Sequence, residues 1–218
     1  MHGAKLVGLL RRALRERPDA VLLLAESGGV RLHEANAGLI AVSEVMRALL
    51  DVREAGIPVV VLIGGANGCF GGMGIVARCA DRVVMSDIGR LAMSGPEVIE
   101  ASHGVEEFDA RDRALVWRTT GGKHRWLTGD CDVLIEDDVA EFRAAAIEGL
   151  DASRRVTLEA LEAENTLLAD RLRRMAEPSE GDDAVALWGR LGVAHAERVS
   201  ELDVASVRAL RDAKGVEA

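Results

Sequence analysis

The stretch PVVVLIGGANGCFGGMGIVARCADRVVMS, residues 58–86, decides the fold. It opens with a continuous aliphatic run, Pro58 to Ile63, which is typical of a strand buried on both faces of a parallel sheet. After the glycine cluster at 64–74, the pattern predicts a short helix from Ile75 to Ala80 and a strand from Arg82 to Ser86. Strand, turn, helix and strand in this order indicate a layered α/β fold with right-handed connections.

The residues on either side extend this pattern. Apolar residues at helical spacing predict an amphipathic helix from Lys5 to Arg17, ended by Pro18. The run AVLLLA, Ala20 to Ala25, predicts another strand buried on both faces, and a helix is expected from about Glu34 to Ala55. From Val139 onward the pattern is helical, with a break at 177–181. We therefore expect a main domain over residues 1–150 and a helical extension over 151–218.

Composition excludes several classes of function. Aromatic residues make up only 3% of the chain and the net charge is -9, which argues against nucleic-acid binding. The apolar run at 57–63 is too short to cross a bilayer, so no membrane partner is expected. Three widely spaced cysteines, Cys69, Cys79 and Cys131, indicate a reduced, cytoplasmic protein in which Cys69 serves packing. No metal site is expected, because His33-Glu34 lacks a second His at zinc-ligand spacing.

Two glycine clusters follow two predicted strands in the same way. Ser27-Gly28-Gly29-Val30 follows the first strand, and the cluster at 64–74 follows the second. Glycine lets a backbone approach a ligand closely, and free amides at a helix start present donors to an anion. One amide from each cluster could form an oxyanion hole, although tight turns alone would also explain the glycines. Neither a P-loop nor a dinucleotide fingerprint fits the spacing.

Four segments carry a resemblance to known families. Residues 63–81, IGGANGCFGGMGIVARCAD, resemble the crotonase superfamily. Residues 26–39 and 94–100 resemble the carboxyltransferase subunits of acyl-CoA carboxylases. Residues 104–125, GVEEFDARDRALVWRTTGGKHR, resemble the beta subunit of biotin-independent malonate decarboxylase. The resemblance is close over residues 1–150 and implies a crotonase-like (ClpP/crotonase) α/β fold, a layered β-β-α superhelix with a helical C-terminal extension.

The resemblance also implies roles for individual glycines. The two oxyanion-hole amides fall on Gly29 and Gly72, and the residues expected to shape substrate binding around them are Gly28, Val30, Gly71, Ser94 and Gly95. Ser94-Gly95 could equally be a plain turn. Ile75 stands where hydratases of the superfamily carry a catalytic Glu, so hydration is disfavoured.

The implied reaction is decarboxylation of a malonyl thioester to the acetyl thioester. The malonyl group would be carried on the phosphopantetheine-like, dephospho-CoA-derived arm of an acyl carrier protein, with no cofactor bound directly by this chain and a gamma subunit as partner. Two alternatives stay open: a carboxyltransferase subunit of a biotin-dependent acyl-CoA carboxylase, and a non-catalytic partner subunit. Family members usually carry further residues before the point matching Met1, so an exposed sheet edge is expected.

Several polar residues are compatible with more than one role. The proton donor to the enolate is not decided by the sequence. The basic pair Lys123 and Arg125 could contact a carboxylate or phosphate, or could simply be solvated. The candidate proton donors are His33, His103, His124, Glu34 and Glu97. Of these, His33 follows the first glycine cluster and is expected to lie nearest the site.

Overall fold

The computed structural model describes residues 1–29, 31–34, 36–65, 67–151, 156–175 and 183–212. The strands are β1 (Val21–Leu24), β2 (Val59–Ile63), β3 (Cys69–Phe70), β4 (Arg82–Ser86), β5 (Leu91–Ala92) and β6 (Val133–Ile135). The earlier helices are α1 (His2–Glu16), η1 (Leu32–Glu34), α2 (Asn36–Glu54), α3 (Gly72–Arg78), α4 (Pro96–His103), α5 (Arg113–Thr120), α6 (Gly122–Thr128) and α7 (Val139–Glu148). The later ones are η2 (Gly149–Asp151), α8 (Leu158–Met175), α9 (Ala184–Arg190), η3 (Ala196–Glu201) and α10 (Val204–Asp212).

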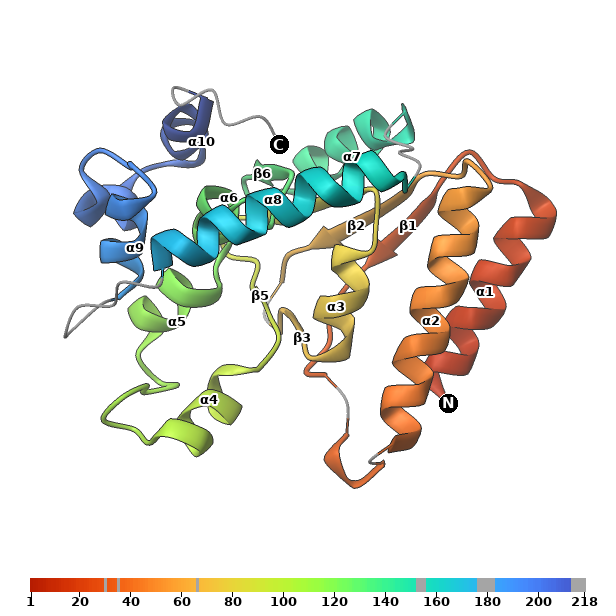
Figure 1. The fold of residues 1–218 in the computed structure, drawn as a ribbon, viewed down its shortest axis with the longest axis horizontal. Coiled ribbons are helices and arrows are strands. Elements are labelled where there is room, and N and C mark those ends of the chain that lie inside the picture. The colour runs from red at the N-terminus through yellow and green to blue at the C-terminus, as the bar shows by residue number, and fades with distance from the viewer. Residues whose placement is uncertain (30, 35, 66, 152–155, 176–182, 213–218) are drawn as a thin grey trace.

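The main sheet is parallel throughout, in the order β1-β2-β4-β6. A second, two-stranded parallel sheet joins β3 to β5. Helices α1 and α2 lie side by side at one end of the molecule, and α9 and α10 lie at the other (Figure 1). The predicted layered α/β class is confirmed.

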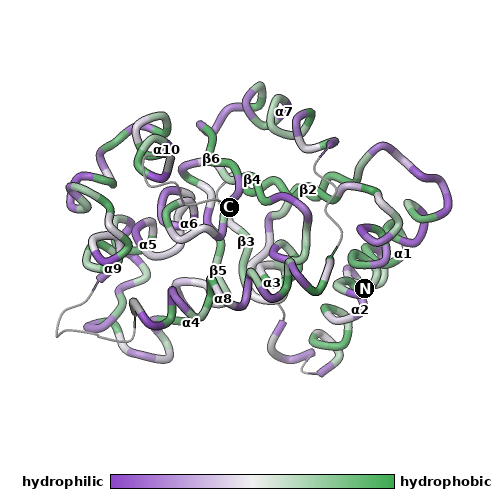
Figure 2. The backbone as a smooth tube through the Cα atoms, turned by 45° about the horizontal axis from the view of Figure 1, so that its top comes forward, coloured by the Kyte–Doolittle hydropathy of each residue, from purple (hydrophilic) through white to green (hydrophobic). Residues whose placement is uncertain are grey.

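The strands bury both faces of the sheet centre. On one face Val59 packs against α1 and α2, while Val61 joins the larger core cluster. On the other face Val60 and Val84 pack with Ala145 of α7. Figure 2 shows that β2 and β4 consist mainly of hydrophobic residues. This alternation fixes the strand register, because a one-residue slip would exchange the two faces.

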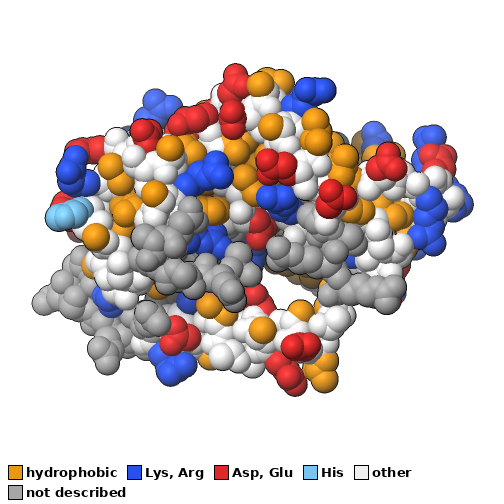
Figure 3. All heavy atoms as spheres, turned by 90° about the horizontal axis from the view of Figure 1, so that it is seen from above, with side chains coloured by type: hydrophobic (Ala, Val, Ile, Leu, Met, Phe, Trp, Pro, Cys, Tyr) orange, Lys and Arg blue, Asp and Glu red, His pale blue; other side chains and the backbone are white. Residues whose placement is uncertain are grey.

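Strand β1 departs from its prediction. We expected both faces to be buried, but Leu22 is 43% exposed and Leu24 is 79% exposed. Val21 and Leu23 turn inward towards the core beside α1 and α2, whereas the buried cluster on the opposite face contains residues of β2, β4, β6 and α7 but none of β1. Strand β1 also pairs only with β2 within the described sheet. Strand β1 is thus an edge strand of the sheet that the structure describes. On the face drawn in Figure 3, hydrophobic side chains likewise reach the surface between charged ones.

The last described helices share the core of the first part of the chain. Trp188, Val199 and Val207 belong to the same buried cluster as Val61 and Met85. The domain boundary expected at residue 150 stays a prediction, and the break expected at 177–181 lies outside the described residues. Within the described part of the chain, no helix is both long and apolar enough to cross a membrane.

Candidate active site

The two glycine turns meet in space. Backbone bonds from Phe70 N–H to Ser27 O and from Ser27 N–H to Gly68 O, both 2.8 Å, tie the loop after β1 to the segment around β3. Gly29 has a φ of 102°, and a Cβ atom built on it would lie 3.3 Å from the Cα atom of Gly71. The structure therefore brings the predicted residues Gly28 and Gly29 beside Gly71, whereas Val30 lies outside the described residues.

Helix α3 begins inside the second glycine cluster. We expected its start at Ile75, but the first helical residue is Gly72, after Gly71 with a φ of 61°. The carbonyl of Gly71 accepts from Gly74 N–H at 2.9 Å and from Ile75 N–H at 3.3 Å. As a first-turn donor, the amide of Gly72 has no acceptor within its own helix. A backbone donor therefore lies next to the turn that holds Gly29.

The amide of Gly29 is engaged only locally. It donates to the hydroxyl of Ser27 at 3.2 Å, at the long end of the range for such bonds. A developing oxyanion is a stronger acceptor than a neutral hydroxyl, so it would compete well for this donor.

Ser94 and Gly95 follow β5, which lies against α3. A Cβ atom built on Gly74 would lie 2.7 Å from the carbonyl oxygen of Ala92, the last residue of β5. The end of β5 therefore lies against the first turn of α3, which begins at Gly72. Gly95 caps the start of α4, and both Ser94 and Gly95 are half-buried. Within the described part of the chain, no hydrogen bond joins Ser94 or Gly95 to the glycine turns.

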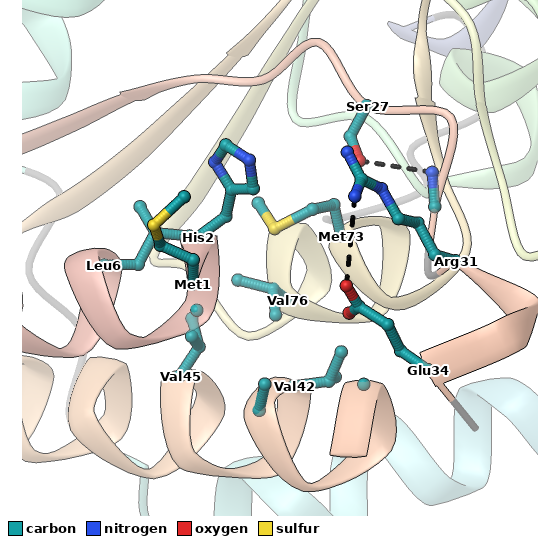
Figure 4. A pocket seen from close by; sticks show the side chains of 14 residues that line it. Met1, His2, Leu6, Ser27, Arg31, Glu34, Val42, Val45, Met73 and Val76 are labelled. Atoms are coloured by element: carbon teal, nitrogen blue, oxygen red, sulfur yellow. Dashed lines mark hydrogen bonds and ion pairs between the residues drawn. The ribbon is translucent and has the colours of Figure 1, made fainter. Parts of the chain in front are cut away.

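A pocket of about 280 Å³ opens beside Gly29, and we call it the Gly29 pocket (Figure 4). Its walls come from α1, α2 and α3, and the sequence interpretation did not identify them. Arg31 and Glu34, three residues apart in the chain, form an ion pair at 4.0 Å on one side of its rim (Figure 4). The apolar walls include Leu6, Val42, Val45, Met73 and Val76.

The structure separates the candidate proton donors. Glu34 is the one of the five that lines the Gly29 pocket. His33 is exposed in η1, His103 is exposed at the end of α4, and Glu97 is exposed in the first turn of α4. Glu34 therefore has the best position, whereas His33, which we expected nearest the site, does not line the pocket.

His124 is a core residue. Its Nδ1 accepts a hydrogen bond from the indole N–H of Trp188 at 3.1 Å, and 8% of the residue is exposed. Burial, reinforced by the charge of Arg125, lowers the pKa of His124 to about 3. A neutral, enclosed imidazole of this kind is unsuited to delivering a proton to the enolate.

The basic pair after α5 has structural partners. The ammonium of Lys123 donates to the carbonyls of Leu202 and Ser200, at 2.5 Å and 3.1 Å, and thereby fixes the end of η3. Arg125 donates to Leu91 O at 2.7 Å and pairs with Asp130 at 3.0 Å. The hydrogen bond from Arg125 to Leu91 therefore stabilises the position of β5.

Cys69 serves packing, as predicted. The thiol lies at zero exposure in β3, and burial raises its pKa to about 12. A protonated, enclosed thiol is a poor nucleophile. Among the described residues, no group of three or more His, Cys, Asp or Glu side chains is arranged to hold a metal ion.

The layered sheet and helices have the crotonase-like fold, as the sequence predicts. The transcarboxylase 12S crystal structure shares this fold at a TM-score of 0.52 and 23% identity, over 66% of this chain and 26% of that one. No family model matches the chain.

Two nearer relatives identify the family. A Pseudomonas malonate decarboxylase hetero-tetramer in complex with malonate contains a chain 37% identical to this one, with a TM-score of 0.72 over 86% of this chain and 68% of that chain. The malonyl-S-ACP:biotin-protein carboxyltransferase of Malonomonas rubra is 40% identical over 88% of this chain. The chain belongs to the malonate decarboxylase subunit family, as its sequence predicts. It spans 65% of the length of the curated relative.

Proposed function

We propose that this chain is the subunit that stabilises the enolate formed when a malonyl thioester loses carbon dioxide. The bond between the α-carbon and the free carboxylate breaks, its electron pair moves into the enolate, and the α-carbon then takes up a proton to give the acetyl thioester. The amides of Gly29 and Gly72 would donate to the thioester oxygen as it gains charge. Preorganised donors of this kind are worth roughly 3 to 4 kcal/mol each. The close approach of Gly29 to Gly71 is the observation that carries the proposal.

The Gly29 pocket suits the departing group. A carboxylate loses hydration in apolar surroundings, whereas carbon dioxide is uncharged, so walls such as Val42 and Met73 favour the direction of decarboxylation. The Arg31–Glu34 pair leaves little net charge at the rim to hold the carboxylate back. We assign Gly28, Val30, Gly71, Ser94 and Gly95 to the surroundings of the substrate.

Glu34 is our candidate for the proton donor. It lines the same pocket as Gly29, and its carboxyl could relay a proton from solvent to the α-carbon once the carbon dioxide has left.

The proposed reaction requires a carrier for the malonyl group and a second subunit. The substrate would arrive on the phosphopantetheine-like, dephospho-CoA-derived arm of an acyl carrier protein, with no cofactor bound directly, and a gamma subunit would complete the assembly. Support comes from the curated relative, whose name includes malonyl-S-ACP, and from the related structure, which is a hetero-tetramer. The three cysteines are free thiols, which suits a reducing cytoplasm.

A second candidate differs in where the carbon dioxide goes. The 40% identical relative is named as a carboxyltransferase to biotin-protein, so the carboxyl group could pass to biotin instead of being released. The enolate-forming step is the same in both reactions. A third reading, a non-catalytic partner subunit, leaves the chemistry to another chain.

The test is decarboxylation by the assembled complex. Malonyl thioester on the carrier protein is supplied to the complete complex with and without avidin, and carbon dioxide and acetyl thioester are measured. We expect equal release in both arms. Inhibition by avidin would transfer the assignment to the biotin-dependent reaction, and absence of product in both arms would reject decarboxylation.

A further inference from the structure

A second cavity, of about 480 Å³, lies away from the glycine turns, and we call it the Arg118 cavity. Its walls come from α5, from the residues after β4, from α6, and from α9 and η3. None of its lining residues lines the Gly29 pocket. It is therefore a separate candidate site.

The cavity concentrates positive charge in an acidic protein. Arg113, Arg118 and Lys123 line it, against a single carboxylate, that of Asp87. The whole chain has a net charge of -9, so a cavity lined by three cations has the opposite charge to the protein as a whole. Local cations of this kind attract an anion.

The guanidinium of Arg118 supplies an unused donor. Its Nε atom is buried and has no hydrogen-bond partner among the described residues. A buried donor without an acceptor costs free energy, so a shift of the Arg118 side chain that turned this N–H towards an anionic oxygen in the cavity would be favourable. Lys123 is held at the wall by the carbonyls of Ser200 and Leu202, and the carboxylate of Asp203 lies close enough to interact with its charge.

The remaining walls are apolar and aromatic. Trp117 lines the cavity with its indole N–H bonded to Ile88 O at 3.2 Å, and the guanidinium of Arg113 lies 5.6 Å from the Trp117 ring centroid. The buried Trp188 and Val199 line the same cavity. Such walls favour a ligand with an organic body as well as a charge.

We propose that the Arg118 cavity binds a small organic anion, a carboxylate or a phosphate monoester with an apolar body. The anionic group would accept from Arg118 and Arg113, since guanidinium groups match both oxyanions in geometry. The apolar body would lie against Trp117 and Ile88. This site does not depend on the proposed decarboxylation.

Intrinsic tryptophan fluorescence offers a direct test, because two of the three tryptophans in the chain line the cavity. The 218-residue chain is titrated with phenyl phosphate, with phenylacetate, and with neutral benzyl alcohol, and affinities are checked by calorimetry. We expect saturable binding of at least one anion, weakened by salt, and no saturable binding of benzyl alcohol. The two anionic arms distinguish a phosphate site from a carboxylate site.

Variants assign the binding to the cations. Arg118→Gln and Arg113→Gln should each weaken the anion by about tenfold, as expected for loss of one charged hydrogen bond. Arg11→Gln, on the exposed surface of α1, is the matched control and should bind as the parent does. Arg113 is exposed, so its variant should fold even if Arg118→Gln does not. Equal binding of benzyl alcohol, or unchanged anion affinity in Arg113→Gln, would overturn the proposal.

Discussion

Gly29 and Gly71 approach so closely that a methyl group on Gly29 would lie 3.3 Å from the Cα atom of Gly71. Gly29 also holds a φ of 102°, which L-residues with side chains rarely adopt. Both features restrict this position to glycine. The close approach of the two turns allows backbone amides from two separate loops to donate hydrogen bonds to one oxygen atom.

The first prediction concerns the Gly29 pocket. Val42→Phe places a larger side chain in its wall and should raise the KM for the malonyl thioester by about tenfold, a loss of roughly 1 to 2 kcal/mol of binding. Steady-state kinetics of the assembled complex checks this. Leu50→Phe, on the exposed side of the same helix, is the control, and an equal KM in the two variants would show that the substrate does not enter the pocket.

The second prediction concerns stability. The buried carboxylate of Asp81 accepts from Arg53 Nε and from Val59 N–H, both at 2.8 Å, and so ties α2 to the start of β2. Asp81→Ala would leave Arg53 without this carboxylate in a largely enclosed site, so urea unfolding should lose about 3 to 5 kcal/mol. Glu16→Gln removes an exposed pair with Arg12 of similar length, 2.7 Å, and should cost well under 1 kcal/mol. Similar losses in both variants would contradict this difference.

The third prediction concerns pH. The pKa of His124 is lowered to about 3 in the folded chain, against about 6.5 when unfolded. Between these values the unfolded chain binds a proton that the folded chain does not. The contribution of neutral His124 to the free energy of unfolding is therefore complete above pH 6.5. It is lost as the pH falls towards 3, at up to about 1.4 kcal/mol per pH unit.

Urea unfolding at pH 7 and pH 5.5 measures this slope. His124→Gln should flatten it by about one proton, whereas His103→Gln, at an exposed histidine, should leave it unchanged. A His124→Gln protein as acid-sensitive as the parent would show that another group is responsible.

The sequence anticipated those elements that carry a strong periodic signal. Strand β4 has the predicted bounds, and β2 and α2 differ from prediction by at most two residues at either end. Strands β3 and β5 have two residues each, and so short a segment shows no periodicity. Strand β1 reads as an aliphatic run whatever its neighbours are, so its exposed face depends on tertiary packing alone.

The site divides in the same way. Gly29 and Gly72 stand out in the sequence because each follows a strand within a glycine cluster. The walls of the Gly29 pocket do not, since Leu6, Val42 and Val76 belong to three different helices and look like ordinary core residues. The Arg118 cavity is harder still, because α5 meets Trp188 and Val199 only after the late helices have packed.

The proposed oxyanion hole depends most on the Gly29 amide, and decarboxylation by a complex containing Gly29→Ala tests it directly. The alanine should displace the amide, and turnover of the malonyl thioester should fall by about 10² to 10³-fold, the usual loss for one oxyanion donor. Gly8→Ala, with open space around the added methyl group, should keep the parent rate. A correctly assembled Gly29→Ala complex that turns over within twofold of the parent would contradict the proposed oxyanion hole.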